Sequence, residues 1–355
     1  MRLIRPVLAV RLVSTLLGVS LCFAAPAAGA VQKKSTTHRS STTTHKKTAY
    51  SATASRARKS RLASARASAR ARETARLNAL AQLREAMTPR YKEDPTSGEM
   101  VPDIRAAAAI VFDPETGKIL YEENAKDQRS IASITKVMTA LVFLEDNPDL
   151  SQEVTVERSD VYAASTTHLR ANDRLTYGEL LHLMLIASDN AAARALARTS
   201  HGGTASFVER MNEKAIELGL DTTSFSDPSG LNPNNVSSAW DLSHLISFAA
   251  SDERIASIMR TPEYTVTTDR RTIPIHSTNH LLLAGDVQVM GGKTGFISKA
   301  GYCLATLLKL PQMDTPLAFV VLGAHSNNGR FWETRHLFDW LNEKTGLVAA
   351  KEPSK

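Results

Sequence analysis

The 355-residue sequence predicts an α/β fold of the α+β type, in which a sheet packs against a lobe of helices. Runs of apolar and β-branched residues lie at both ends of the region from residue 101 to 348, whereas residues with helical spacing fill its middle. A region of this length can bury one large hydrophobic core. We therefore expect one domain, with its functional site in the cleft between the sheet and the helical lobe.

The expected elements follow in order along this region. Two strands joined by a tight turn are predicted over residues 107–112 and 118–121, because the segment between them is rich in turn-forming residues. Helices are predicted over residues 175–187, 191–199, 205–219 and 239–250, the last after a sequence that resembles a capping box. Further strands are predicted over residues 264–268, 272–276, 288–297, 302–308 and 317–322, and a closing helix over residues 331–341.

The sequence before this region has a different character. Residues 1–30 are predicted to be a cleaved signal peptide, because three arginines precede an apolar stretch that ends in Ala28-Gly29-Ala30. Residues 31–75 are predicted to be disordered, since they hold almost no large apolar side chains. A helical linker is expected over residues 76–100, and a disordered tail over residues 349–355. After removal of the signal peptide no later stretch is long and apolar enough to span a membrane. The sequence therefore predicts an exported chain, and only one cysteine, Cys303, remains in it, which excludes an intrachain disulfide.

Charge is distributed unevenly along the chain. Residues 31–74 contain 12 Lys and Arg against one Glu, a net charge of +11, whereas residues 76–355 carry −7. The folded part is therefore acidic, and the basic character belongs to the segment before it. For an exported chain we expect residues 31–75 to contact an anionic membrane or an acidic wall polymer rather than nucleic acid, or to act only as a solvated spacer.

Ser133 and Lys136 are the first candidates for chemistry. Residues i and i+3 share one face of a helix, so the two side chains are predicted to lie side by side. Residues 137–144 are almost all apolar, which predicts a buried helix. Burial disfavours the ammonium form, so Lys136 is expected to act as the neutral amine that takes the hydroxyl proton of Ser133. Ser133 is expected in the first turn of that helix, where unpaired N–H groups can stabilise an oxyanion.

Two more motifs follow, Ser188-Asp189-Asn190 and Lys293-Thr294-Gly295. Each motif alone has a structural explanation. Ser133 and Lys136 could be a helix start with a surface lysine, the second motif could cap a helix, and the third could be a strand with a glycine bend. All three in this order favour a serine acyl-transfer site. Ser133 would then lie at the floor of the cleft, with the second motif on one wall and the third on a facing strand.

These motifs resemble the signature of class A β-lactamases and penicillin-binding proteins. The longer stretches 131–140, 227–231, 235–237 and 291–296 are similar to the low-molecular-mass D-alanyl-D-alanine peptidases, in particular to endopeptidases of the penicillin-binding protein 7 type. The resemblance covers residues 101–345. It implies a serine β-lactamase/transpeptidase-like fold with an antiparallel sheet flanked by helices, and a hydrolase of peptidoglycan stem peptides that serves cell-wall biogenesis and cell shape, is inhibited by β-lactam antibiotics and needs no metal or cofactor.

The resemblance also implies roles for individual residues. As catalytic residues, Ser133 attacks the D-alanyl carbonyl, Lys136 takes its proton, and Ser188 passes a proton to the leaving amine. Among the implied substrate-binding residues, Asn190 holds the substrate amide and Lys293 attracts an anionic group. Thr294 binds a carbonyl or carboxylate, and Gly295 lets the substrate backbone approach closely. The Phe296 N–H completes the oxyanion hole.

Other functions fit the sequence less well. Gly292-Lys293-Thr294 lacks the earlier glycine of a phosphate-binding loop, and no His-Glu-x-x-His motif is present for a zinc peptidase. No second base of the class A β-lactamase form follows Asn190. The short sequence after Gly295 favours a D,D-endopeptidase acting on D-alanyl-diaminopimelate cross-links. A D-alanyl-D-alanine carboxypeptidase is the alternative, and a wall-binding protein with a vestigial site is a weaker one.

Overall fold

A computed structural model describes the backbone of residues 47–351 and the side chains of residues 58–346. Within it, Ala69–Lys355 forms one compact unit. Its central element is a five-stranded antiparallel sheet with the strand order β11-β12-β13-β3-β4. The strands are β3 (Ala108–Phe112), β4 (Ile119–Glu123), β11 (Gln288–Ile297), β12 (Gly301–Lys309) and β13 (Leu317–Ala324). In this order β3, which comes first along the chain, pairs with β13, which comes last. The two edge strands are β11 and β4.

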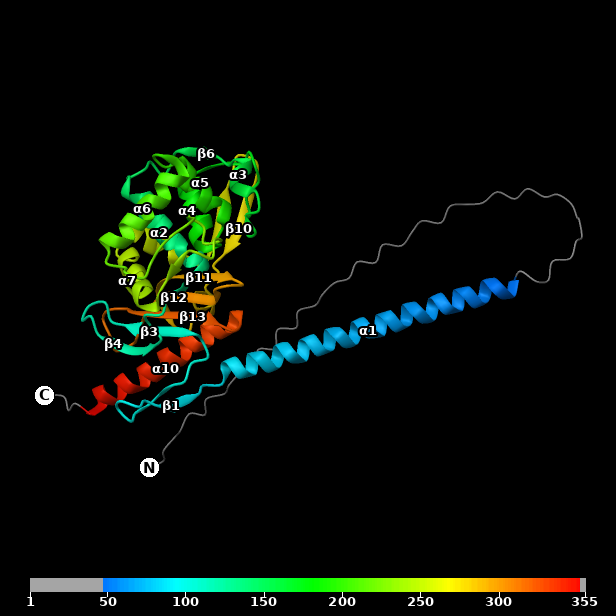
Figure 1. Ribbon diagram of the computed structural model, residues 1–355, viewed down its shortest axis with the longest axis horizontal. Helices are drawn as coiled ribbons and strands as arrows, with labels where there is room; N and C mark the ends of the chain where they lie inside the picture. Colours follow the sequence, from blue (N-terminus) through cyan, green and yellow to red (C-terminus); the bar gives the residue numbers. More distant parts are fainter. Residues whose placement is uncertain (1–46, 352–355) are drawn as a thin grey trace, which may run out of the picture. The chain divides into compact units, whose positions relative to one another are not determined.

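Both faces of the three central strands are buried, so β3, β12 and β13 are apolar almost throughout. Along β13, Ala318, Val320 and Leu322 enter one core, whereas Phe319 and Val321 enter the other. One core joins the sheet to the helical lobe through α7 (Ala239–Ala249). The other lies under α10 (Asn327–Lys351), which covers the opposite face (Figure 1). The sequence prediction of sheet, helical lobe and closing helix is confirmed.

The helical lobe is built around α2 (Lys136–Glu145), of which every residue from Lys136 to Leu144 is buried. A short 3-10 turn, η1 (Ala132–Thr135), leads into it. The remaining helices are α3 (Arg158–Val161), α4 (Tyr177–Ile186), α5 (Asn190–Thr199), α6 (Gly203–Glu217), α8 (Glu253–Met259) and α9 (His280–Ala284). Four two-stranded sheets complete the described part: β1 (Tyr91–Glu93) with β2 (Met100–Pro102), β5 (Arg129–Ser130) with β8 (Val236–Ser237), β6 (Glu153–Thr155) with β7 (Arg174–Thr176), and β9 (Glu263–Thr267) with β10 (Thr272–His276).

The region before residue 101 differs from the sequence prediction. A single helix, α1 (Lys47–Met87), occupies much of the segment predicted to be disordered. Its sequence contains no Gly or Pro and is rich in Ala and Arg, which are strong helix formers, so low hydrophobicity did not prevent a helix. The predicted signal peptide, residues 31–46 and residues 352–355 lie outside the described residues.

The boundaries of the folded domain also move outward. Strand β1 lies within the predicted linker and β2 begins at its last residue, Met100, whose carbonyl accepts a hydrogen bond from the Trp340 indole N–H at 3.3 Å. An ion pair of 2.6 Å joins Lys344 to Glu99. At the other end, α10 continues to Lys351 into the predicted tail. No helix in the described part of the chain is long and apolar enough to cross a bilayer.

Candidate active site

Ser133 and Lys136 lie at the junction of η1 and α2. Ser133 is in the 3-10 turn rather than in the first turn of α2, but the two side chains still meet, with Lys136 Nζ 2.8 Å from Ser133 Oγ. Nζ also lies 2.6 Å from Asn190 Oδ1 and contacts the carbonyl oxygen of Ser229. Lys136 is fully buried, and this burial lowers its pKa to about 7, although Asp189 and Asp227 act in the opposite direction. Near neutral pH a large fraction of this amine is therefore unprotonated.

Two glycines fix the backbone that carries Ser133. Gly230 has a φ of +82°, and a Cβ there would lie 2.0 Å from the carbonyl oxygen of Ala132. A Cβ at Gly295 would lie 2.6 Å from the carbonyl oxygen of Ile131 and 3.2 Å from the Ser133 nitrogen. The residue at 295 must therefore be glycine because the protein's own turn approaches it, whereas the sequence prediction assigned that closeness to substrate.

The second motif forms the wall on the helical lobe. Ser188 has a φ of 60°, an unusual conformation for a residue with a side chain, and it presents its hydroxyl to the cleft. Asp189 is fully buried and caps α5 by accepting a hydrogen bond from the Ala192 N–H at 3.0 Å. The capping explanation of this motif thus holds for Asp189. Asn190 is left free to face Lys136, with its Nδ2 group donating to the Ala164 carbonyl at 2.7 Å.

The third motif forms the opposite wall, on edge strand β11. Lys293 Nζ lies 2.8 Å from Ser188 Oγ and 2.9 Å from the carbonyl oxygen of Thr294. Burial lowers the pKa of Lys293 well below its usual value, and the neighbouring cations Lys136 and Arg330 lower it further. Ser188 therefore meets a lysine that holds its proton weakly.

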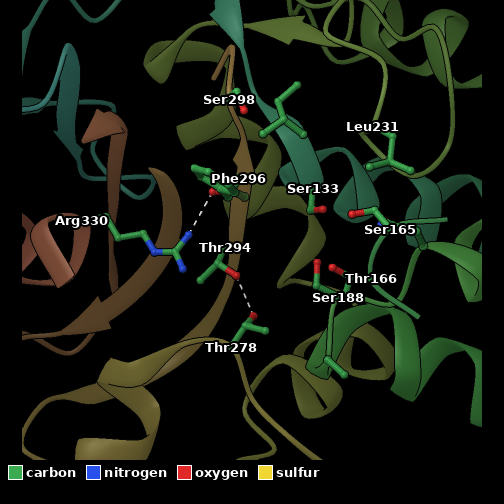
Figure 2. A pocket seen from close by; sticks show the side chains of 14 residues that line it. Ser133, Ser165, Thr166, Ser188, Leu231, Thr278, Thr294, Phe296, Ser298 and Arg330 are labelled. Atoms are coloured by element: carbon green, nitrogen blue, oxygen red, sulfur yellow. Dashed lines mark hydrogen bonds between the residues drawn. The ribbon is translucent and has the colours of Figure 1, made fainter. Parts of the chain in front are cut away.

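The three motifs surround a cavity of 410 Å³ (Figure 2). Six of the eight predicted site residues line it: Ser133, Ser188, Asn190, Thr294, Gly295 and Phe296. Lys136 and Lys293 lie behind this lining and contact the cavity through the hydroxyls of Ser133 and Ser188. All eight predicted residues are thus brought into one site.

Several residues of the cavity wall were not predicted from the sequence. Ser165 lies next to Ser133, with its hydroxyl pointing toward it, and Thr166 lies beside Ser188 (Figure 2). Thr278 and Thr294 share a hydrogen bond of 2.6 Å between their hydroxyl oxygens. None of these positions belongs to a local motif, since tertiary contacts alone bring them to the cavity.

Arg330 also lines the cavity from α10, and no local sequence signal marks it. Its guanidinium donates to the carbonyl oxygens of Gly295 at 3.0 Å and Cys303 at 3.1 Å. Burial lowers its pKa to about 10. The side chain therefore ties β11 and β12 together directly behind the cleft.

This geometry has the parts of serine acyl transfer. A hydroxyl is in contact with a buried amine whose pKa is close to neutrality, which is the arrangement that activates a weak nucleophile. A second hydroxyl, that of Ser188, is hydrogen-bonded to a second lysine, Lys293, and lines the same cavity. Among the described residues no cluster of three or more His, Cys, Asp or Glu side chains is arranged to hold a metal ion.

Comparisons with known proteins agree with this chemistry. Residues 95–326 match the model of peptidase family S11, described as D-alanyl-D-alanine carboxypeptidase. The chain is 33% identical over 251 residues to the D-alanyl-D-alanine endopeptidase of Escherichia coli K12, covering 70% of this chain and 80% of that protein. It is 33% identical over 252 residues to the endopeptidase of Pseudomonas aeruginosa, with the same coverage of 70% and 80%.

A carboxypeptidase and a solved structure are similar as well. The chain is 32% identical over 242 residues to the D-alanyl-D-alanine carboxypeptidase DacF of Bacillus subtilis, covering 66% of this chain and 61% of that protein. The crystal structure of the Streptomyces K15 DD-transpeptidase superposes with a TM-score of 0.63 at 29% identity, over 67% of this chain and 97% of that one. The predicted serine β-lactamase/transpeptidase-like fold is thereby confirmed. With its three motifs around one cleft, the chain belongs to the S11 family of serine-type D-alanyl-D-alanine peptidases.

Proposed function

We propose that this peptidase is a periplasmic D,D-endopeptidase, which hydrolyses D-alanyl-diaminopimelate cross-links of peptidoglycan through an acyl-enzyme and is inhibited by β-lactams. The observation that supports the chemistry best is the 2.8 Å contact between Ser133 Oγ and the buried amine of Lys136. A lysine in water is almost entirely protonated at neutral pH and could not accept a proton. The buried Lys136, with a pKa of about 7, can.

In the proposed acylation step, Ser133 Oγ attacks the carbonyl carbon of the D-alanyl residue while Lys136 Nζ accepts the hydroxyl proton. The negative charge that develops on the carbonyl oxygen is stabilised by the N–H groups of Ser133 and Phe296. This pairing is supported by the close passage of β11 past η1, since a Cβ at Gly295, the residue before Phe296, would lie 3.2 Å from the Ser133 nitrogen.

Collapse of the tetrahedral intermediate breaks the C–N bond, and the leaving amine receives a proton. Ser188 is proposed to deliver it, since its hydroxyl lies between the cavity and Lys293 Nζ. The proton that Ser188 delivers is replaced by the one that Lys136 took from Ser133, so Lys136 is a neutral amine again before deacylation. Water then attacks the ester carbonyl while Lys136 accepts a proton from it, and this proton passes to Ser133 Oγ as the ester bond breaks and Ser133 is released. Asn190 and Thr294 face the same cavity and are proposed to hold the substrate amide and the substrate carbonyl or carboxylate.

Both endopeptidases and carboxypeptidases would use this chemistry, because the acyl group is the same and only the leaving amine differs. The names of the Escherichia coli and Pseudomonas aeruginosa relatives, each matched over 80% of its length, favour the endopeptidase. The Bacillus subtilis relative and the description of the family model favour the carboxypeptidase, which we keep as the second candidate.

Labelling with a fluorescent penicillin tests the acyl-enzyme. The parent protein should be labelled stoichiometrically, and Ser133→Ala should not be labelled at all. Ser257→Ala, which changes an exposed serine on α8, serves as the matched control and should be labelled like the parent. Stoichiometric labelling of Ser133→Ala would reject Ser133 as the nucleophile.

Digestion of purified muropeptides tests the specificity. Cross-linked dimers should be converted to monomers, while pentapeptide monomers should persist over the same time. Release of free D-alanine from pentapeptides, with dimers intact, would make the protein a carboxypeptidase instead.

A further inference from the structure

Over residues 58–84, helix α1 carries its basic residues on one side. Within residues 58–84 eight Lys and Arg side chains are all exposed: Arg58, Lys59, Arg61, Arg66, Arg70, Arg72, Arg76 and Arg84. At 3.6 residues per turn they fall within about half of the helix circumference. Of these eight side chains only Arg76 forms an ion pair with another described residue, a long one of 3.9 Å with Glu73. The positive charge of this half is therefore available to a partner.

The basic half also carries the large apolar side chains of the helix. Leu62, Leu77 and Leu80 are 49%, 57% and 51% exposed. By helical spacing they fall among the arginines rather than opposite them. The other half is formed mainly by small residues, which include Ser60, Ala63, Ser64, Ala67, Ala71, Ala75 and Ala81.

The last turns of α1 show which half faces the folded domain. Gln82, Glu85 and Ala86 line a cavity with Arg105 and Glu333, and Ala86 is buried. By helical spacing these three positions belong to the half opposite the basic one. Around this end of the helix, the catalytic domain therefore leaves the half that contains Arg76 and Arg84 uncovered.

We propose that this half of α1, the basic face, binds the surface of a phospholipid bilayer that contains anionic lipids. Arginine and lysine attract headgroup phosphates, and their long side chains allow neighbouring apolar residues to reach the hydrocarbon boundary. A surface that combines cations with exposed leucines matches such an interface. An acidic polymer would use the charges of the basic face and leave Leu62, Leu77 and Leu80 in water.

The inference rests on the proposed function only for the periplasmic location, which supplies a membrane surface. It assigns α1 to the attachment of the enzyme, beside substrate that is itself fixed in the wall. The chemistry at Ser133 is independent of it, so penicillin labelling and membrane binding can succeed or fail separately.

Co-sedimentation of the exported, processed protein with lipid vesicles tests the proposal. We expect binding to mixed phosphatidylglycerol/phosphatidylcholine vesicles, weak binding to pure phosphatidylcholine, and a steep loss as salt is raised. Equal binding to both vesicle types would overturn the proposal.

An exchange variant tests the face rather than the net charge. The pairs Arg66→Ala/Ala67→Arg, Arg70→Ala/Ala71→Arg and Arg76→Ala/Ala75→Arg move three charges to the other half without changing composition. Binding should fall by about tenfold or more, since each charge near the surface contributes substantially. Unchanged circular dichroism and penicillin labelling would show that the variant is folded, and parent-like vesicle binding by it would overturn the proposal.

A leucine variant separates a bilayer from an acidic polymer. Replacing Leu62, Leu77 and Leu80 with Ala keeps every charge and should weaken vesicle binding several-fold, whereas Ser60→Ala/Ser64→Ala on the other half should have no effect. If the leucine variant binds vesicles like the parent, or if the parent binds purified wall sacculi and not vesicles, the partner is an acidic polymer and the proposal fails.

Discussion

Lys136 and Lys293 reach the cleft from opposite walls, and their surroundings differ. Lys136, on the helical side, contacts three oxygens, and the carboxylates of Asp189 and Asp227 partly offset the effect of burial on its pKa. Lys293, on β11, contacts the Ser188 hydroxyl and one carbonyl, and its charged neighbours are the cations Lys136 and Arg330. The same side chain is therefore placed in two different electrostatic environments within one site.

This difference supports a division of roles. Lys136 has a pKa near neutrality and suits proton exchange with Ser133 at every stage of the proposed cycle. Lys293 holds its proton weakly, so an anionic substrate group that enters beside it would raise its pKa and restore the charge. We therefore propose that Lys293 responds to the charge of the substrate, whereas Lys136 responds mainly to pH.

Removing Lys136 should have the largest effect. Lys136→Ala should lower the rate of acylation by penicillin by about 10³-fold or more, because general base catalysis and the activation of Ser133 are lost together. The measurement is single-turnover labelling, with Lys118→Ala in the exposed β3–β4 turn as the matched control. The double variant Ser133→Ala/Lys136→Ala should be no worse than Ser133→Ala, and additive losses would contradict a single nucleophile–base unit.

Removing Lys293 should have a smaller effect that depends on the substrate. Lys293→Ala should slow acylation by a penicillin, which carries a carboxylate, by about 100-fold. Acylation by an uncharged thioester should slow less, because no substrate charge is lost as a partner. The measurement is the ratio of the penicillin acylation rate to the thioester acylation rate, compared between the parent and the variant. Lys309→Ala on β12 is the control. Equal losses for the two substrates would show that Lys293 acts on Ser188 alone.

The pH dependence of acylation should follow Lys136. The neutral amine is the active form, and its fraction rises as pH increases through about 7. Below that value kcat/KM should fall by about tenfold per pH unit, and above it the rate should level off. The measurement is a stopped-flow profile of the acylation rate against pH with an uncharged thioester. Such a substrate carries no charge for Lys293 to bind, so the profile reports the titration of Lys136. A profile that is flat between about pH 5 and 8 would exclude Lys136 as the base.

Disturbing the contact between β11 and η1 should have the smallest effect. Gly295→Ala places a methyl group 2.6 Å from the Ile131 carbonyl oxygen, so β11 or η1 must move. We expect a loss of about 1–3 kcal/mol in the free energy of unfolding and a several-fold slower acylation. Denaturant unfolding and penicillin labelling measure the two effects. Gly117→Ala, at a turn with open space around its Cβ position but a φ of +70°, is the control, since it introduces backbone strain without a clash. Full stability of Gly295→Ala would show that the turn yields easily.

The features that could be predicted from the sequence are those set by local spacing. Ser133 and Lys136 are three residues apart, so their contact depends on one turn of backbone, and a 3-10 turn preserves it as well as an α-helix does. The central strands β3, β12 and β13 were recognised because both of their faces are buried, which makes their sequences almost continuously apolar. The part of α1 before residue 76 was missed because the prediction of disorder rested on low hydrophobicity, whereas an Ala- and Arg-rich segment without Gly or Pro can form a helix. Its last turns, residues 76–87, lie in the segment that was predicted to be a helical linker.

The sequence alone was sufficient to indicate a serine–lysine acyl-transfer site. Each of the three motifs consists of a few adjacent residues of the types that this chemistry needs, so motifs and their order can be recognised without a structure. Tertiary structure alone decided how the motifs meet: that Lys293 contacts Ser188 across 105 residues, that Arg330 supports β11 from α10, and that Gly230 and Gly295 make room for η1. The apolar residues 137–144 already predicted that Lys136 is buried and holds its proton weakly, but the lowered pKa of Lys293 was decided only by the tertiary structure. Its burial and the charges of Lys136 and Arg330 come from other elements, and neither is encoded in the few residues beside Lys293.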